Sequence, residues 1–145
     1  MRRCLGRSRG GWTSKLHAAV NGRGSVVRLT LSPGQASEGP RAPELLAGLR
    51  PGHVVADSAY DSDALRRQLR RRRIRACIRS NGNRRRVRPY DRQRYKHRNV
   101  VERFFGAIKG GFRRVATRYE KKAQNYLGFT WLAAVLVSWA NVHSA

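Results

Sequence analysis

Two carboxylates of this chain lie where an acid could take part in chemistry. Glu102 is the only acidic residue between Asp91 and Glu120, a stretch that is otherwise basic and aromatic. Asp57 comes directly after the short apolar segment 53–56. The ends of such strands are where α/β proteins place their reacting groups. The remaining acids have simpler interpretations, because they lie at a helix start, in turns or in surface segments.

Carboxylate oxygens are ligands that suit Mg²⁺ or Mn²⁺, and the surrounding arginines would keep both acids ionised. Two such ions about 4 Å apart can stabilise the attacking and leaving oxygens of a displacement at phosphorus. The competing interpretation is an ion pair between Arg98 and Glu102, four residues apart on a helix, which contributes only about 0.3–0.5 kcal/mol. The spacing by itself favours neither interpretation.

The charge of the chain indicates a polyanionic partner. Its 145 residues include 32 Lys and Arg against 8 Asp and Glu, for a formal net charge of +24. Such a balance is far from that of an ordinary enzyme of small metabolites and is typical of nucleic-acid binding. Because this binding is driven largely by release of counterions from phosphates, we expect it to weaken as salt rises.

The N-terminal part of the chain predicts a β-hairpin. Residues 1–11 are rich in Arg and Gly and resemble a basic lead-in without structure of its own. Segment 12–20 alternates in hydrophobicity, and segment 25–31 is rich in β-branched residues. The Asn-Gly turn between them suits a positive φ angle. We therefore expect a hairpin over 12–31.

The middle of the chain, residues 43–79, predicts alternating helices and strands. The expected elements are a short helix, a strand, a helix capped by Ser62 and a second strand, at 43–49, 53–56, 63–72 and 74–78. The order of strand, helix and strand is typical of an α/β domain whose sheet has a parallel part. Asp57 would lie at the end of the first of these strands. Residues 80–94 follow as a basic loop.

Residues 95–145 predict two helices. The first crosses Glu102 and is interrupted near Gly110-Gly111. Its expected inner face consists of Val101, Phe105, Ile108 and Phe112. Glu102 would then lie at the border of this face and could point across at the strand end that carries Asp57.

The second C-terminal helix is expected from about Lys122 to His143. It contains an apolar run of about 15 residues, which is shorter than the roughly 20 residues that span a bilayer. We therefore expect a buried helix, no membrane association and a cytoplasmic protein.

Four residue types at three fixed gaps carry a family resemblance: Tyr95, Arg98, Glu102 and Lys109. This pattern resembles the motif around the catalytic glutamate of bacterial insertion-sequence transposases of the DDE type. Segment 54–61, VVADSAYD, is similar to the second motif of that family, in which an apolar strand ends in the second catalytic aspartate and a tyrosine follows three residues later. The stretches GRSRGGWTSKLHAAV, LSPGQAS and FRRVATRYEK extend the resemblance from Gly6 to the C-terminus.

The resemblance implies an RNase H-like α/β fold, with a mixed sheet and flanking helices. In the family, three carboxylates hold two Mg²⁺ or Mn²⁺ ions that cleave and rejoin phosphodiester bonds at the ends of the transposable element. On that basis Asp57 corresponds to the second catalytic aspartate and Glu102 to the glutamate, both as metal ligands. Tyr95, Arg98 and Lys109 fall on the accompanying DNA-binding positions near the transferred strand. Lys109 would lie two helical turns beyond Glu102 on the same side.

The sequence also departs from the family pattern. The first catalytic aspartate is expected upstream of the segment GRSRGG, but no carboxylate occurs before Glu38. We therefore expect residues 1–145 to be a partial catalytic domain without its first strand, inactive alone and prone to associate. A second copy or an upstream transposase fragment would be its protein partner. Two glycines within the helix of Glu102 are a second departure, at about 1 kcal/mol each relative to alanine.

These observations leave more than one function open. The first hypothesis is DNA transposition, a form of DNA recombination, through Mg²⁺-dependent strand cleavage and transfer on element ends and target DNA in the bacterial nucleoid. The alternative is a non-catalytic DNA-binding regulator or transposase remnant. A basic RNA-binding protein of the ribosomal type would show no preference for DNA, and the acid-bearing motifs argue against it.

Overall fold

The computed structural model describes residues 6–8, 11–117 and 122–143. The chain divides into two compact units. The central unit comprises Ser37–Asn99, and the hairpin unit combines the residues up to Ala36 with those from Val100 onward. Both helices and strands occur in each unit, so the predicted α/β class is confirmed.

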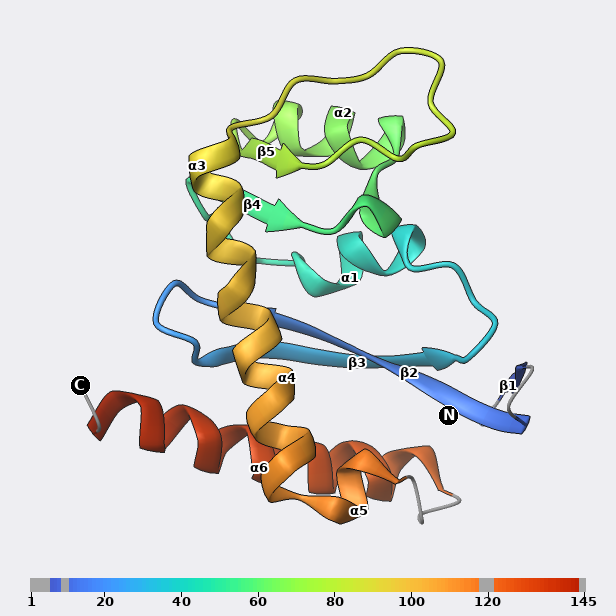
Figure 1. Ribbon diagram of the computed structural model, residues 1–145, viewed down its shortest axis with the longest axis vertical. Helices are drawn as coiled ribbons and strands as arrows, with labels where there is room; N and C mark the ends of the chain where they lie inside the picture. The colour runs from blue at the N-terminus through green and yellow to red at the C-terminus, as the bar shows by residue number, and fades with distance from the viewer. Residues whose placement is uncertain (1–5, 9–10, 118–121, 144–145) are drawn as a thin grey trace. The chain divides into compact units, whose positions relative to one another are not determined.

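The hairpin unit contains a three-stranded antiparallel sheet (Figure 1). Strand β2 (Gly11–Val20) pairs with β3 (Val26–Pro33), so the hairpin predicted over 12–31 is confirmed. The turn differs from the prediction, because among its glycines the positive φ belongs to Gly24, at 83°. The side chain of Asn21 holds the turn by accepting hydrogen bonds from the following amides of Arg23 and Ser25.

A short strand corrects the prediction of an unstructured lead-in. Strand β1 (Gly6–Ser8) pairs with the beginning of β2, with Gly6 opposite Thr13. The prediction was wrong here because Arg- and Gly-rich composition says little about a segment whose backbone can pair with a neighbouring strand. The rest of the predicted lead-in, residues 1–5 and 9–10, lies outside the described residues.

Three helices complete the hairpin unit: α4 (Asn99–Gly111), α5 (Arg113–Ala116) and α6 (Ala123–His143). As predicted, the helix that carries Glu102 ends at the two glycines. One side of α6 packs against β3, and the buried core of the unit includes Leu29, Leu31, Phe104, Ile108, Val115, Tyr126, Ala133, Ala134 and Val137. Residues 118–121, which end the predicted motif FRRVATRYEK, lie outside the described residues.

The prediction that the C-terminal helix is buried holds for only one of its sides. Large apolar side chains on the other side of α6 are 43–62% exposed: Phe129, Leu132, Val135, Leu136 and Trp139. An all-round apolar sequence predicts burial, but the sheet of this unit covers only the side of α6 that carries Tyr126, Ala133 and Val137. No helix of the described residues is long and apolar enough to cross a membrane.

The central unit is built on two parallel strands joined by a helix. Strands β4 (His53–Ala56) and β5 (Arg75–Ile78) pair in parallel, and α2 (Asp63–Arg71) connects them. The Ser62 hydroxyl accepts a hydrogen bond from the Leu65 amide at 3.2 Å, which confirms the predicted cap. The core of the unit consists of Ala42, Leu46, Leu65, Leu69, Ile74 and Ile78.

Shorter elements surround these strands. They are the helices α1 (Ala42–Leu45) and α3 (Arg92–Tyr95) and the 3₁₀ helices η1 (Gly39–Arg41), η2 (Ser58–Tyr60) and η3 (Lys96–Arg98). Helix α3 begins inside the predicted loop 80–94 because Asp91 caps it, accepting a hydrogen bond from the Arg94 amide at 3.0 Å. The parallel and antiparallel strands form two small sheets in the described part of the chain.

Candidate active site

Asp57 lies directly after β4, where the sequence predicts it. Its side chain caps η2, because Oδ1 accepts hydrogen bonds from the Ser58 amide at 2.5 Å and from the Ser58 hydroxyl at 3.0 Å. The side chain remains 48% exposed. The carboxylate is therefore held by its own backbone turn while one side of it stays open to solvent.

Arg98 forms an ion pair with Asp57. Its Nη1 lies 2.6 Å from Asp57 Oδ2, and its guanidinium carbon lies 5.9 Å from the centre of the Tyr95 ring. A cation at this distance from an aromatic ring is attracted to its face. The structure thus brings together three of the predicted site residues, Asp57, Tyr95 and Arg98, within the central unit.

Two half-buried tyrosines accompany Asp57. Burial, followed by the negative charges of Glu38 and Asp57, raises the pKa of Tyr60 to about 12. Burial, with the charge of Asp57 acting in the same direction, also raises the pKa of Tyr95, whose ring packs edge-on against Tyr90 at 5.1 Å between centroids. Both phenols are therefore neutral at physiological pH.

Glu102 and Lys109 lie on α4 in the hairpin unit, and both are exposed. The predicted inner face of this helix was right in part: Ile108 is buried, and Phe105 and Phe112 pack partly buried against the core, but the other two buried side chains are Val100 and Phe104. Apolar residues occupy two adjacent rows of this helix, and both rows contact the core, with the row that begins at Val100 the more deeply buried. Glu102 is exposed and is two residues from Val100, so it lies outside the more deeply buried row.

A carboxylate such as that of Asp57 is a type of donor that a hard divalent ion prefers. Mg²⁺ in phosphoryl-transfer sites is commonly held by one or two carboxylates, with substrate phosphates and water completing the shell. Asp57 offers an exposed carboxylate, and its contact with Arg98 shows that this oxygen attracts a cation. Among the described residues there is no group of three or more His, Cys, Asp or Glu side chains that could hold a metal. Carboxylates of the described ranges could therefore supply only part of a shell.

The sequence analysis missed the most deeply buried carboxylate of the central unit. Asp61 has a side chain with 0% exposure, and it contacts Arg66 Nε at 2.7 Å and Arg84 Nε at 2.5 Å. The Asn81 amide donates a third bond at 2.9 Å. Burial alone would raise the pKa of Asp61, but the bonds from Asn81, Arg66 and Arg84 together hold it below its usual value.

The position of Asp61 and Asp63 near the start of α2 explains only some of the contacts that these two acids make. Asp63 lies in the first turn of α2, as expected, but it also pairs with Arg84 at 2.9 Å. Arg84 is 23 residues from Asp61, so no local spacing could have indicated the contact. The only available signal was the absence of any other carboxylate between Asp63 and Asp91.

Comparison with known proteins agrees with the resemblance seen in the motifs. Residues 6–138 match the family model described as the transposase DDE domain. A protein of Brucella ovis that carries the provisional name of transposase for insertion sequence element IS6501 is 39% identical over 127 residues. The aligned region covers 86% of this chain and 97% of that protein. No solved structure matches the chain.

Proposed function

The chain belongs to the family of transposases with a DDE domain, and on this premise we propose that it serves DNA transposition through Mg²⁺-dependent cleavage and transfer of DNA strands. The observation that supports this proposal best is Asp57, a half-exposed carboxylate fixed at the end of a parallel strand beside Arg98. An RNase H-like fold for the complete catalytic domain is part of the proposal. The order of an antiparallel hairpin, a parallel strand–helix–strand unit and C-terminal helices supports it.

In this proposal Asp57 and Glu102 are the metal ligands that the chain itself provides. When bound, Mg²⁺ or Mn²⁺ would stabilise the charge on the attacking and leaving oxygens of the phosphodiester. Arg98 is close enough to Asp57 to bind both that carboxylate and a phosphate of the substrate strand, and Tyr95 would orient its guanidinium. Lys109 would contact a phosphate on the side of α4 that carries Glu102.

Metal-linked stability tests the site without requiring turnover. The chain is mixed with a DNA duplex that contains an element end, and its melting temperature is compared with and without Mg²⁺. At ten times its Kd, a ligand stabilises the folded state by about 1.4 kcal/mol, which corresponds to about 4 °C for a chain of this size. We expect Asp57→Asn and Glu102→Gln each to abolish the shift.

Glu44→Gln is the matched control, because it removes an exposed carboxylate of a surface ion pair. It should leave the Mg²⁺ shift intact. The absence of a shift in the unmodified chain would favour the alternative function, a DNA-binding regulator without catalysis. Salt-sensitive DNA binding alone cannot separate the two functions, because both require it.

Self-association is the second part of the proposal. The apolar stripe of α6, formed by Phe129, Leu132, Val135, Leu136 and Trp139, exposes roughly 500 Å² if each full side chain offers about 200 Å². Two copies would then bury about 1,000 Å², near the lower limit for a specific interface.

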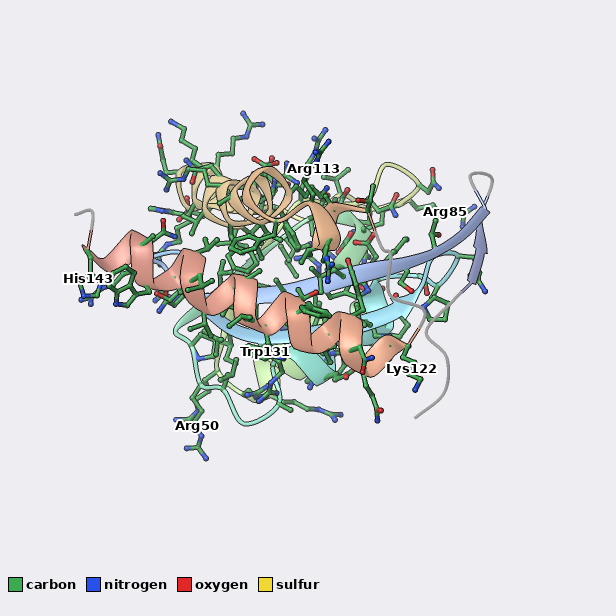
Figure 2. The ribbon with its side chains drawn as sticks, turned by 90° about the horizontal axis from the view of Figure 1, so that it is seen from below. Arg50, Arg85, Arg113, Lys122, Trp131 and His143 are labelled. Carbon is green, nitrogen blue, oxygen red and sulfur yellow. The ribbon has the colours of Figure 1, made fainter. Side chains whose placement is uncertain are left out.

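Charge favours a second copy of this chain as the occupant of the stripe. In a twofold dimer the same patch meets itself, so two chains of charge +24 can approach closely only through a surface that carries no charge. Helix α6 meets this condition, because no Lys, Arg, Asp or Glu occurs between Ala123 and His143. Figure 2 labels Lys122 and His143 at the two ends of this uncharged stretch.

Sedimentation equilibrium of the purified chain tests this interface. We expect a dimer for the unmodified protein and a shift to monomer for Leu132→Gln, whose side chain is 60% exposed. Val27→Gln changes an exposed apolar residue on β3 and should leave the dimer intact. A monomer at all concentrations, or equal dimerisation of both variants, would exclude the α6 interface.

A further inference from the structure

The connection between β5 and α3 in the central unit is a tied loop. Figure 1 shows this connection extending past α2 before it returns to α3. Its ends are fastened where the Ser80 hydroxyl accepts a bond from the Arg88 amide at 2.8 Å and lies 3.2 Å from the Arg88 carbonyl. Compact surface loops whose ends meet in this way are often functional.

Hydrogen bonds and ion pairs of two carboxylates hold the same loop against the start of α2. Asp61 binds the Asn81 amide and the Arg84 guanidinium, and Asp63 binds Arg84 at 2.9 Å. The Arg66 guanidinium contacts Asp61 and donates to the carbonyl of Ile78, the last residue of β5. Asp61 therefore connects the helix, the strand end and the loop at one point.

The loop is held by polar contacts and buries almost no apolar surface. Between Ser80 and Arg88 its one large apolar side chain, Val87, is 73% exposed. Loops without apolar burial are normally mobile, because contacts must offset the entropy lost when their backbone is fixed. Here the anchoring residues fix a segment whose outward side chains include the exposed Arg85 and Arg86.

We propose that the loop 80–88 is a DNA phosphate-binding element, and that Asp61 is the positioning residue that holds its arginines in place. This inference rests on the proposed function only in taking DNA as the partner. A fixed loop binds a polyanion better than a mobile one because the cost of ordering its side chains and backbone is already met. Phosphate contacts of this kind are independent of sequence and position the protein on the duplex.

The direction in which Asp61→Asn changes the DNA affinity distinguishes positioning of the loop from an effect of net charge. Asp61→Asn raises the formal charge from +24 to +25, so a protein that bound DNA by charge alone would bind more tightly. If Asp61 positions the loop, the variant binds more weakly and releases fewer counterions. The measurement is the Kd for a labelled DNA duplex of arbitrary sequence, from fluorescence anisotropy across a range of NaCl concentrations in EDTA, where no cleavage can occur.

The arginines at the outside of the loop are tested by Arg85→Gln/Arg86→Gln. Each lost phosphate contact lowers the slope of log K against log salt by about 0.9, so we expect a decrease of about 2 for the double variant. The matched control is Arg50→Gln/Arg75→Gln, which removes two exposed arginines of the same unit outside the loop. Its slope should change by less than about 0.5. Figure 2 shows Arg50 extending away from the ribbon.

If circular dichroism shows that Asp61→Asn does not fold, Ser80→Ala provides the test instead. This variant is neutral in charge and removes the fastening at Arg88, so a decrease in slope supports the tied loop. Equal slopes for Ser80→Ala and the unmodified chain, tighter binding by a folded Asp61→Asn, or equal losses in the two double variants would each overturn the inference. If the unmodified chain does not bind DNA at all, the proposed function fails with it.

Discussion

Arg98 and a divalent ion should compete for Asp57, and the competition can be measured. The Arg98 guanidinium lies 2.6 Å from Asp57 Oδ2, and the Asp57 side chain is 48% exposed. A metal ligated by the same oxygen at about 2.1 Å would have to share it with the guanidinium or displace it. We predict that Arg98→Gln binds Mn²⁺ more tightly than the unmodified chain in the absence of DNA.

The exposure of the pair limits the magnitude of this effect. The side chains of Arg98 and Asp57 are 30% and 48% exposed, and ion pairs of such exposure contribute at most about 1 kcal/mol. Releasing Asp57 from the pair should therefore tighten Mn²⁺ binding by no more than about fivefold. A larger gain would require a buried pair, which this is not.

The assay is the electron paramagnetic resonance signal of free Mn²⁺, titrated with protein at constant ionic strength. Arg94→Gln is the matched control, because Arg94 forms an exposed ion pair with Asp91 at 3.1 Å and its removal makes the same change in net charge. It should alter the Kd by less than about twofold. Unchanged or weaker Mn²⁺ binding by Arg98→Gln would refute the competition, and unchanged binding by Asp57→Asn would refute the metal site itself.

Two further predictions concern stability. The raised pKa of Tyr60, about 12, means that its contribution to the free energy of unfolding is complete below the unfolded pKa near 10 and is lost as pH rises from 10 to 12. Alkaline unfolding followed by circular dichroism should therefore show a drop in stability that is smaller in Tyr60→Phe, and an equal drop in that variant would contradict the assignment. A Cβ at Gly106, within α4, would meet no atom within 4 Å, so urea unfolding of Gly106→Ala should show a gain of about 1 kcal/mol in the free energy of unfolding. Gly24→Ala should instead be destabilised, because Gly24 has a φ of 83° and a Cβ there would lie 3.2 Å from Asn141 Nδ2.

The elements predicted correctly from the sequence are those whose signals are local. The hairpin follows from two alternating segments around a turn, and the parallel pair follows from two short apolar segments on either side of a capped helix. Asp57 could be placed at the end of β4 because the strand and the acid are adjacent in sequence. None of these required knowledge of a distant residue.

The orientation of α4 shows where local periodicity fails. Residues 100, 101, 104, 105 and 108 are all apolar, so two rows one residue apart both fit a helix face. Packing buried the first row more deeply, with Val100 8% and Phe104 1% exposed, while Phe105 of the second row packs partly buried against the core. A shift of one residue corresponds to about 100° around the helix, so periodicity alone could not tell which of the two rows would be the more deeply buried.

The partner of each carboxylate was the least predictable feature, and it is also what separates the roles of Asp57 and Asp61. The Asp61 side chain has 0% exposure, and each of its carboxylate oxygens is bound by an arginine, with the Asn81 amide as a further donor. A metal could reach Asp61 only by displacing Arg66, Arg84 or the Asn81 amide from its oxygens. Asp57, four residues earlier, keeps 48% of its side chain exposed, and its ion pair is weak enough to open. Exposure therefore makes Asp57 the better candidate for metal and phosphate chemistry and leaves Asp61 to order the arginines around it.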